Sequence, residues 1–82
     1  MIFYHRFLEV YPDFKRKLLS INPSLTQSEI EFCALVKVKL NNKEISTSKK
    51  ISIRAVDSKK YRIRQKLFIP SGESLYDFLD KI

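Results

Sequence analysis

The chain has 82 residues and a net charge of +7, and 44% of its residues are hydrophobic, with six Phe and four Tyr among them. This composition supports one small hydrophobic core and excludes a chain that is disordered throughout. A single glycine and three prolines are too few turn residues for a β-sandwich or a hairpin protein. Cys33 is the only cysteine, which excludes a disulfide framework and a cysteine-based zinc site and fits a reducing cytoplasm.

The positive charge is concentrated in one segment. Residues 53–69 carry six Lys or Arg and one acid, a net charge of +5, whereas residues 1–24 and 25–52 each carry +2 and residues 70–82 carry −2. Such a local excess predicts an element that faces a polyanion rather than a surface adapted for general solubility.

Two short helices are predicted ahead of Pro23. The first covers residues 2–10, and the second begins at Pro12, which fits the first turn of a helix. Their apolar residues recur at helical spacing: Phe3, Phe7 and Val10, then Phe14, Leu18 and Ile21. We expect residues 1–22 to form an N-terminal helical extension that covers the core or connects it to an upstream sensor domain outside this chain.

A third helix is predicted by a capping box, with Thr26 as the N-cap and Glu29 three residues later. Its apolar residues are numerous enough for a buried helix: Ile30, Phe32, Cys33, Ala34, Leu35, Val36 and Val38. The four residues Lys37 to Leu40 also alternate as a strand would, but they lie inside the longer helical pattern, which we favour.

Three more helices are predicted after Leu40. Asn41 or Asn42 caps a short helix with Glu44 in its first turn, and residues 49–52 form a tight turn. Ser52 then caps a longer helix that runs to about Leu67. Residues 70–72 break the chain, and a last helix over residues 73–82 has an apolar stripe formed by Leu75, Phe78, Leu79 and Ile82.

The helix predicted over residues 52–67 has two unlike faces. At ~100° per residue, Val56, Ile63 and Leu67 fall within about 40° of one another, and Ser58 and Tyr61 point the opposite way. Arg54 and Gln65 share the exposed face. Asp57 is the only acid in this helix, so that five cations lack a partner within it: Lys59, Lys60, Arg62, Arg64 and Lys66. A short helix, a tight turn and a longer helix have the geometry of a helix-turn-helix, although such corners also occur in ordinary helical bundles. The basic charge of the second helix favours the helix-turn-helix, within an all-α fold.

Residues 25–67 resemble, without a gap, the LuxR/NarL-type helix-turn-helix output domain. The resemblance is carried by Leu25-Thr26, Glu29, Leu35, Asn42-Lys43-Glu44-Ile45, Ile51-Ser52, Val56, Ile63 and Lys66-Leu67. The flanking sequences look like the version found at the C-terminus of larger Bacteroidetes-type regulators. The resemblance implies a four-helix core within residues 23–82, with residues 52–67 as the recognition helix. It also implies a cytoplasmic bacterial transcription regulator that binds double-stranded DNA sequence-specifically, often as a homodimer.

The resemblance also implies roles for individual residues. The candidates for reading base edges are Asp57, Ser58 and Tyr61, and the candidates for contacts with the DNA backbone are Thr26, Lys43, Arg54, Lys60 and Arg62. The last helix of the family often forms a dimer, so the candidate dimer surface is Leu75, Phe78, Leu79 and Ile82, although packing against the core of the same domain is the alternative use of this stripe.

Four residues depart from the family pattern, and one of them, Ser46, replaces a small alanine and should fit. Lys39 stands where the family usually has glycine, so we expect the turn there to be built differently. Lys49 replaces a buried leucine, which leaves a thinner core unless its aliphatic stem is buried. Asp57 stands where many members have a basic residue, so the DNA sequence preference of other members does not transfer.

Other functions find less support in the sequence. A helix-turn-helix that docks an acidic protein partner is the main alternative, because charge alone does not separate DNA from an acidic protein. An enzyme is not expected: His5 is the only histidine, there is no Gly-rich phosphate loop, and no cofactor, metal or small-molecule site is evident. No apolar run approaches the ~20 residues that cross a bilayer, so no membrane partner is expected.

Overall fold

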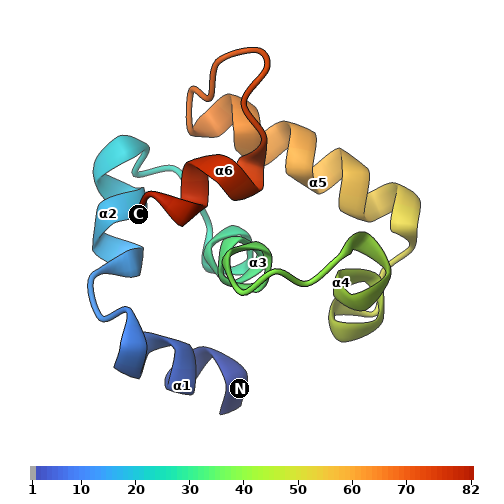
Figure 1. Ribbon diagram of the computed structural model, residues 1–82, viewed down its shortest axis with the longest axis horizontal. Helices are drawn as coiled ribbons and strands as arrows, with labels where there is room; N and C mark the ends of the chain where they lie inside the picture. The colour runs from blue at the N-terminus through green and yellow to red at the C-terminus, as the bar shows by residue number, and fades with distance from the viewer. Residues whose placement is uncertain (1) are drawn as a thin grey trace.

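The computed structural model describes residues 2–82, and that part of the chain contains six α-helices and no strand (Figure 1). The helices are α1 (Ile2–Val10), α2 (Phe14–Ile21), α3 (Gln27–Lys37), α4 (Asn42–Lys49), α5 (Ile53–Lys66) and α6 (Leu75–Asp80). The all-α prediction is therefore confirmed. Residues 37–40 are not extended, because they form the end of α3 and the turn after it.

Helix α3 is the central element of the fold. It is seen nearly end-on in the middle of Figure 1, with α1 and α2 on one side of it, α4 on the other and α6 running across it. Seven of its eleven residues are buried, including its N-terminal Glu29. A helix that is apolar on nearly all sides needs neighbours on several sides, and α1, α4 and α6 pack directly against it.

All six helices contribute to one hydrophobic core. Its buried members include Phe7 from α1, Phe14 and Leu18 from α2, Ile30, Phe32 and Cys33 from α3, Ile45 from α4, Val56 and Ile63 from α5, and Leu75 and Leu79 from α6. The rings of Phe7 and Phe14 meet edge to face with their centroids 4.8 Å apart. Residues 1–22 were expected to cover the core or to connect it to an upstream sensor domain, and four of their side chains are among the buried members of that core: Tyr4, Phe7, Phe14 and Leu18.

Side-chain caps set the beginning of most helices. Thr26 caps α3 in the predicted capping box, and Ser52 caps α5 as expected. Asn41, rather than Asn42, caps α4, and its own capping box with Glu44 decides between the two. The prediction that α2 begins at Pro12 is wrong, because α2 begins at Phe14 after a turn through residues 12 and 13.

Three helices end in the same left-handed turn without a glycine. Lys39 after α3, Lys50 after α4 and Phe68 after α5 have φ angles of 72°, 57° and 57°. In each turn the next residue is apolar, and its N–H donates to the carbonyl five residues earlier: Leu40 to Leu35, Ile51 to Ser46, and Ile69 to Arg64. Lys39 was expected to build this turn differently from glycine, but it adopts the positive φ that glycine favours. The turn after α3 is therefore left-handed with a lysine in it.

Candidate nucleic-acid interface

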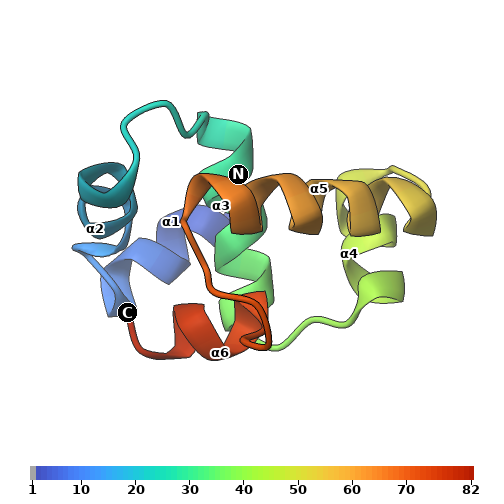
Figure 2. The same ribbon diagram turned by 90° about the horizontal axis from the view of Figure 1, so that it is seen from above.

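Helices α4 and α5 are joined by a short turn and pack against each other, with α5 running across the molecule in both views (Figures 1 and 2). The buried stripe of α5 consists of Val56, Ile63 and Leu67, each at most 2% exposed, as the helical spacing predicted. Ile45 of α4 is fully buried in the same core. The stripe fixes which side of α5 faces inward, and therefore which side remains for a partner.

The opposite side of α5, which we call the exposed face, consists of Arg54, Ser58, Tyr61, Arg62 and Gln65. The side chain of Tyr61 is 65% exposed, and its hydroxyl oxygen accepts a hydrogen bond of 3.1 Å from Gln65 Nε2. Together with Asp57, four of these residues line an open hollow of about 500 Å³: Ser58, Tyr61, Arg62 and Gln65. The exposed face thus combines cations, hydroxyls and an amide on one continuous surface.

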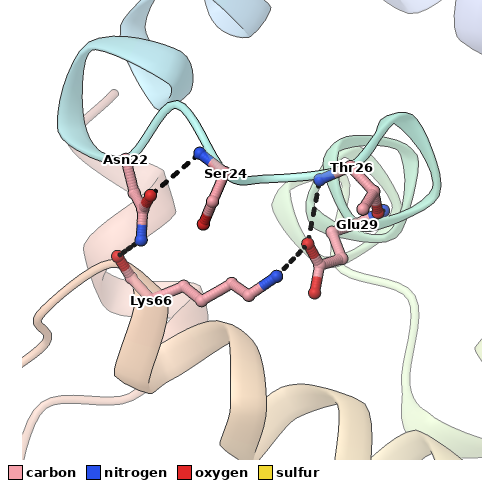
Figure 3. Close-up of polar contacts among 5 residues, drawn as sticks. All are labelled: Asn22, Ser24, Thr26, Glu29 and Lys66. Carbon is pink, nitrogen blue, oxygen red and sulfur yellow. Dashed lines mark hydrogen bonds and ion pairs between the residues drawn. The ribbon is translucent and has the colours of Figure 1, made fainter.

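One flank of α5 is attached to the beginning of α3 (Figure 3). Lys66 Nζ lies 2.9 Å from Glu29 Oε1, which also accepts from the Thr26 N–H at 2.9 Å. Asn22 Nδ2 donates to the Lys66 carbonyl at 3.1 Å, and its Oδ1 accepts from the Ser24 N–H at 2.9 Å. These contacts hold the loop before α3 against the C-terminal end of α5.

The carboxylate of Glu29 is the buried charge of this flank. Its burial would raise its pKa, but the hydrogen bonds from the Thr26 N–H and Lys66, together with the positive charge of Lys66, outweigh burial and lower the pKa below its usual 4.5. Glu29 therefore stays ionised at neutral pH, and the pair with Lys66 persists there.

The other flank of α5 is attached to α4 and to the segment before α6. Asp57 Oδ1 accepts from Asn42 Nδ2 at 2.9 Å, and Asn42 Oδ1 accepts from Lys60 Nζ at 2.5 Å. The guanidinium of Arg64 donates to the carbonyl of Glu73 and, at 3.5 Å, to the carbonyl of Pro70. Both flanks of α5 are thus fixed by polar contacts, whereas its exposed face is not.

These contacts revise the prediction that the cations of α5 lack partners. Lys66 has a carboxylate partner from α3, while Lys60 and Arg64 bond to neutral oxygen atoms of other segments. Arg54 and Arg62 form no ion pair or hydrogen bond through their side chains within residues 2–82, and both are exposed. The cations without a partner are therefore fewer than the sequence suggested: Arg54 and Arg62 lie on the exposed face, and Lys59, which forms no ion pair or side-chain hydrogen bond within residues 2–82, is half-buried.

The predicted base-reading residues share one surface, but they differ in their contacts. Ser58 and Tyr61 are on the exposed face, whereas Asp57 lies at its edge and is held by Asn42. Asn42 was not among the candidate site residues, because a contact between side chains fifteen residues apart leaves no signal in local spacing. Gln65 was assigned to the exposed face but not to the reading residues, and it lies beside Tyr61.

The predicted backbone-contact residues are spread over three helices. Arg54 and Arg62 are on the exposed face of α5, and Lys43 is exposed in the first turn of α4. Thr26 is exposed and caps α3 on the flank that holds Lys66. Lys60 is half-buried and points to Asn42 rather than away from the protein.

The candidate dimer residues of α6 mostly pack inside the monomer. Leu75 and Leu79 are 4% and 0% exposed, and Phe78 and Ile82 are partly buried against the same core. Packing within the domain, the alternative that the sequence left open, therefore accounts for Leu75 and Leu79. Only Phe78 and Ile82 retain exposed area for a partner.

Lys49 shows how a charged residue replaces an expected apolar one. Its side chain is only 16% exposed, and Nζ lies 3.5 Å from Glu31 Oε1. The aliphatic stem is therefore buried while the ammonium is paired. The stem fills the space in the core that the replaced leucine would otherwise have left.

Other kinds of site find no support in the described part of the chain. Residues 2–82 bring together no group of three or more His, Cys, Asp or Glu side chains that could hold a metal ion. His5 is exposed, and Cys33 is buried, which raises the pKa of its thiol to about 12. Among residues 2–82, every helix is too short or too polar to cross a membrane.

Comparisons with family models, with curated proteins and with solved structures found no match to this chain.

Proposed function

We propose that this chain binds double-stranded DNA sequence-specifically, with α5 as the recognition helix in the major groove and α4 as the supporting helix of a helix-turn-helix. The proposed context is the output domain of a bacterial transcription regulator of the LuxR/NarL type. The observation that carries the proposal is the difference between the flanks and the exposed face of α5. Polar contacts fix the flanks to the rest of the protein, while the exposed face presents unpaired arginines beside short polar groups.

The exposed face has the chemistry that duplex DNA requires. Arg54 and Arg62 supply cations for phosphates, and the hydroxyls of Ser58 and Tyr61 supply both donors and acceptors for base edges. A helix about 10–12 Å across fits the major groove. Gln65 is a further reading residue, because its amide can pair with adenine once it leaves the Tyr61 hydroxyl.

The fixed flanks give this face a defined orientation. Arg64 and Lys66 are near the C-terminal end of α5, and they bond to segments on opposite sides of that helix. Rotation of α5 about its axis would break both sets of contacts. A recognition helix that is held in this way needs little ordering when it binds, so more of the contact energy is available for affinity.

A second candidate function is the docking of an acidic protein on the same helix. It is favoured by two exposed apolar side chains at the ends of α5, Ile53 at 50% and Phe68 at 73% exposure. Large apolar anchors of this kind are typical of protein interfaces. Against this function, the face between these two residues carries two arginines and polar side chains, with Tyr61 as its one aromatic ring, and contains no aliphatic side chain.

The deciding experiment is a selection from a random duplex library at about 150 mM salt, followed by sequencing of the retained DNA. We expect an enriched motif, and a two-fold symmetric motif would give the half-site spacing of a dimer. Retention without enrichment that disappears as salt rises would contradict sequence-specific recognition. In that case the Phe68→Ala variant and an acidic partner become the next objects of study.

A further inference from the structure

Three side chains form a polar chain between α4 and α5. Lys60 Nζ donates to Asn42 Oδ1 at 2.5 Å, and Asn42 Nδ2 donates to Asp57 Oδ1 at 2.9 Å. Asn42 is the first residue of α4 and is half-buried, whereas Asp57 is exposed at the edge of the hollow on the exposed face. The amide of Asn42 thus separates an ammonium from a carboxylate, and no ion pair joins Lys60 directly to Asp57.

This arrangement fixes the orientation of each group in turn. Because an ammonium only donates, Lys60 requires the oxygen of the Asn42 amide, and the NH₂ group then faces Asp57. The Asp57 carboxylate is held through one oxygen, and Oδ2 accepts no hydrogen bond within residues 2–82. Without Asn42, this carboxylate would have Arg54 three residues before it and Lys60 three residues after it as partners on the same helix.

We propose that Asn42 is a positioning residue that holds Asp57 ready to accept a hydrogen bond from the N4 amino group of a cytosine. The chain then prefers a C·G pair at one position of its site. This inference rests on the proposed function and specifies what one part of the exposed face reads.

The chemistry of the major groove selects the base. Guanine presents only acceptors there, and thymine presents an acceptor and a methyl group, so both are unfavourable beside a carboxylate. Adenine offers a donor at N6, but its neighbouring N7 is an acceptor that repels a second carboxylate oxygen. Cytosine offers the N4 amino group and has no acceptor of its own in the groove, and it is therefore the preferred partner of Asp57.

Lys60 has an internal role in this arrangement. Its ammonium orients the Asn42 amide from the far side, and its half-buried position keeps it away from the exposed face. The resemblance to the LuxR/NarL family placed Lys60 among the DNA backbone contacts. In the proposed arrangement Lys60 orients the Asn42 amide instead of contacting a phosphate.

The test is a duplex selection with the wild type, Asp57→Ala, Asn42→Ala and the double variant. We expect the wild type to enrich C at one position by about 10-fold, and Asp57→Ala to remove this preference. Asn42→Ala should reduce it to about 2-fold, with affinity for unrelated duplexes within about 3-fold of the wild type and the helical fold retained in circular dichroism. Because Asp57→Ala already removes the preference, the double variant should match Asp57→Ala at that position, whereas a purely structural role of Asn42 would lower the affinity of the Asn42→Ala variant for all duplexes and leave its C preference intact.

Controls separate the inference from the proposed function. Ser48→Ala changes an exposed residue on the same helix and should leave every preference intact. Asn42→Asp keeps a partner for Lys60 but cannot donate to Asp57, so it should lose the preference even if Asn42→Ala fails to fold. A C preference that survives both Asn42 variants, or an enriched motif with no position sensitive to Asp57→Ala, would overturn the inference while DNA binding stands. A wild type that enriches nothing would overturn both.

Discussion

Phe68 combines two unfavourable features at a single residue. It is 73% exposed, and its φ of 57° is a conformation that side chains with a Cβ rarely adopt. The turn nevertheless forms, because the N–H groups of Phe68 and Ile69 donate to carbonyls of the last turn of α5 and Ile69 is buried. Burial and hydrogen bonding therefore override the local conformational preference.

Substitution of this residue should stabilise the protein. The left-handed conformation costs a non-glycine residue about 1–2 kcal/mol, and the greater freedom of glycine in the unfolded chain cancels part of the gain. We expect Phe68→Gly to raise the free energy of unfolding by about 0.5–1 kcal/mol, measured by urea denaturation. Ser48→Gly, within the exposed surface of α4, should instead lower it by about 0.5 kcal/mol. Destabilisation by Phe68→Gly would show that the Phe68 ring makes a contact worth more than the strain.

The residue scale also shows which parts of the site the sequence could predict. The caps Thr26 and Ser52 and the stripe Val56, Ile63 and Leu67 follow from local spacing, and all are present. The partners of Lys66 and Asp57 are 37 and 15 residues away, and their choice depends on how the helices cross. Periodicity predicts which side of a helix is buried, but it does not predict which side chain a neighbouring helix brings to the flank.

At the scale of elements, the pair of Glu29 and Lys66 connects the first turn of α3 to the last turn of α5 (Figure 3). The pKa of Glu29 is lower in the folded protein than its usual 4.5. The unfolded state therefore takes up a proton first as the pH falls. The stabilisation is fully present above about pH 4.5 and is lost as the pH falls through the folded-state pKa.

We expect Glu29→Gln to lower the free energy of unfolding by about 1–2 kcal/mol at pH 7, because a charge-assisted hydrogen bond is replaced by a neutral one. The difference from the wild type should shrink steadily below about pH 4.5. Urea denaturation at a series of pH values measures both effects. Glu9→Gln, at an exposed position of α1, is the matched control and should show a small difference throughout. A penalty for Glu29→Gln that does not change with pH would mean that the ionised pair adds nothing to a neutral hydrogen bond.

The order of the elements was predictable because each helix carries its own signals. All six helices of residues 2–82 were expected, and each begins within about two residues of its predicted start. The signal that starts α2 was wrongly assigned: Pro12 was placed in the first turn of the helix, but it lies in a turn before the helix begins. The side chain of Asp13 makes no capping bond, and the helix instead begins where Phe14 is buried. Burial thus outweighed the local preference of proline.

At the scale of the whole molecule, the first two helices belong to the same core as the rest. Phe14 is 2% exposed and meets Phe7 edge to face, and Leu18 is fully buried. Residues 1–22 lie outside the predicted helix-turn-helix segment, and they were expected only to cover the core or to connect it to an upstream sensor domain. A domain of 82 residues buries little surface, and the loss of two helices from one side of α3 would expose much of it.

Phe14→Ala should therefore destabilise the entire domain. Truncation of a buried Phe costs about 3–5 kcal/mol, a large part of the stability of a chain of this size. We expect the loss in urea denaturation followed by circular dichroism, with a single transition for all helices. Val10→Ala, at a residue 70% exposed on α1, should change the stability by less than about 0.5 kcal/mol. A variant in which α3 to α6 keep the wild-type stability would show that the first two helices form a separate unit.

The uneven distribution of charge leads to a prediction for the whole surface. If the net charge alone drove DNA binding, the position of a removed cation would not matter. If the exposed face of α5 contacts phosphates, Arg62→Ala should reduce the slope of log affinity against log salt by about 0.9, the contribution of one neutralised phosphate. Arg6→Ala removes the same charge from an exposed position of α1, far from α5 in Figure 1, and should leave the slope nearly unchanged.

Titration of a fluorescent duplex at several salt concentrations measures both slopes. Equal slopes for the two variants would assign binding to the general charge of +7, whereas a change in Arg62→Ala alone would assign it to the exposed face.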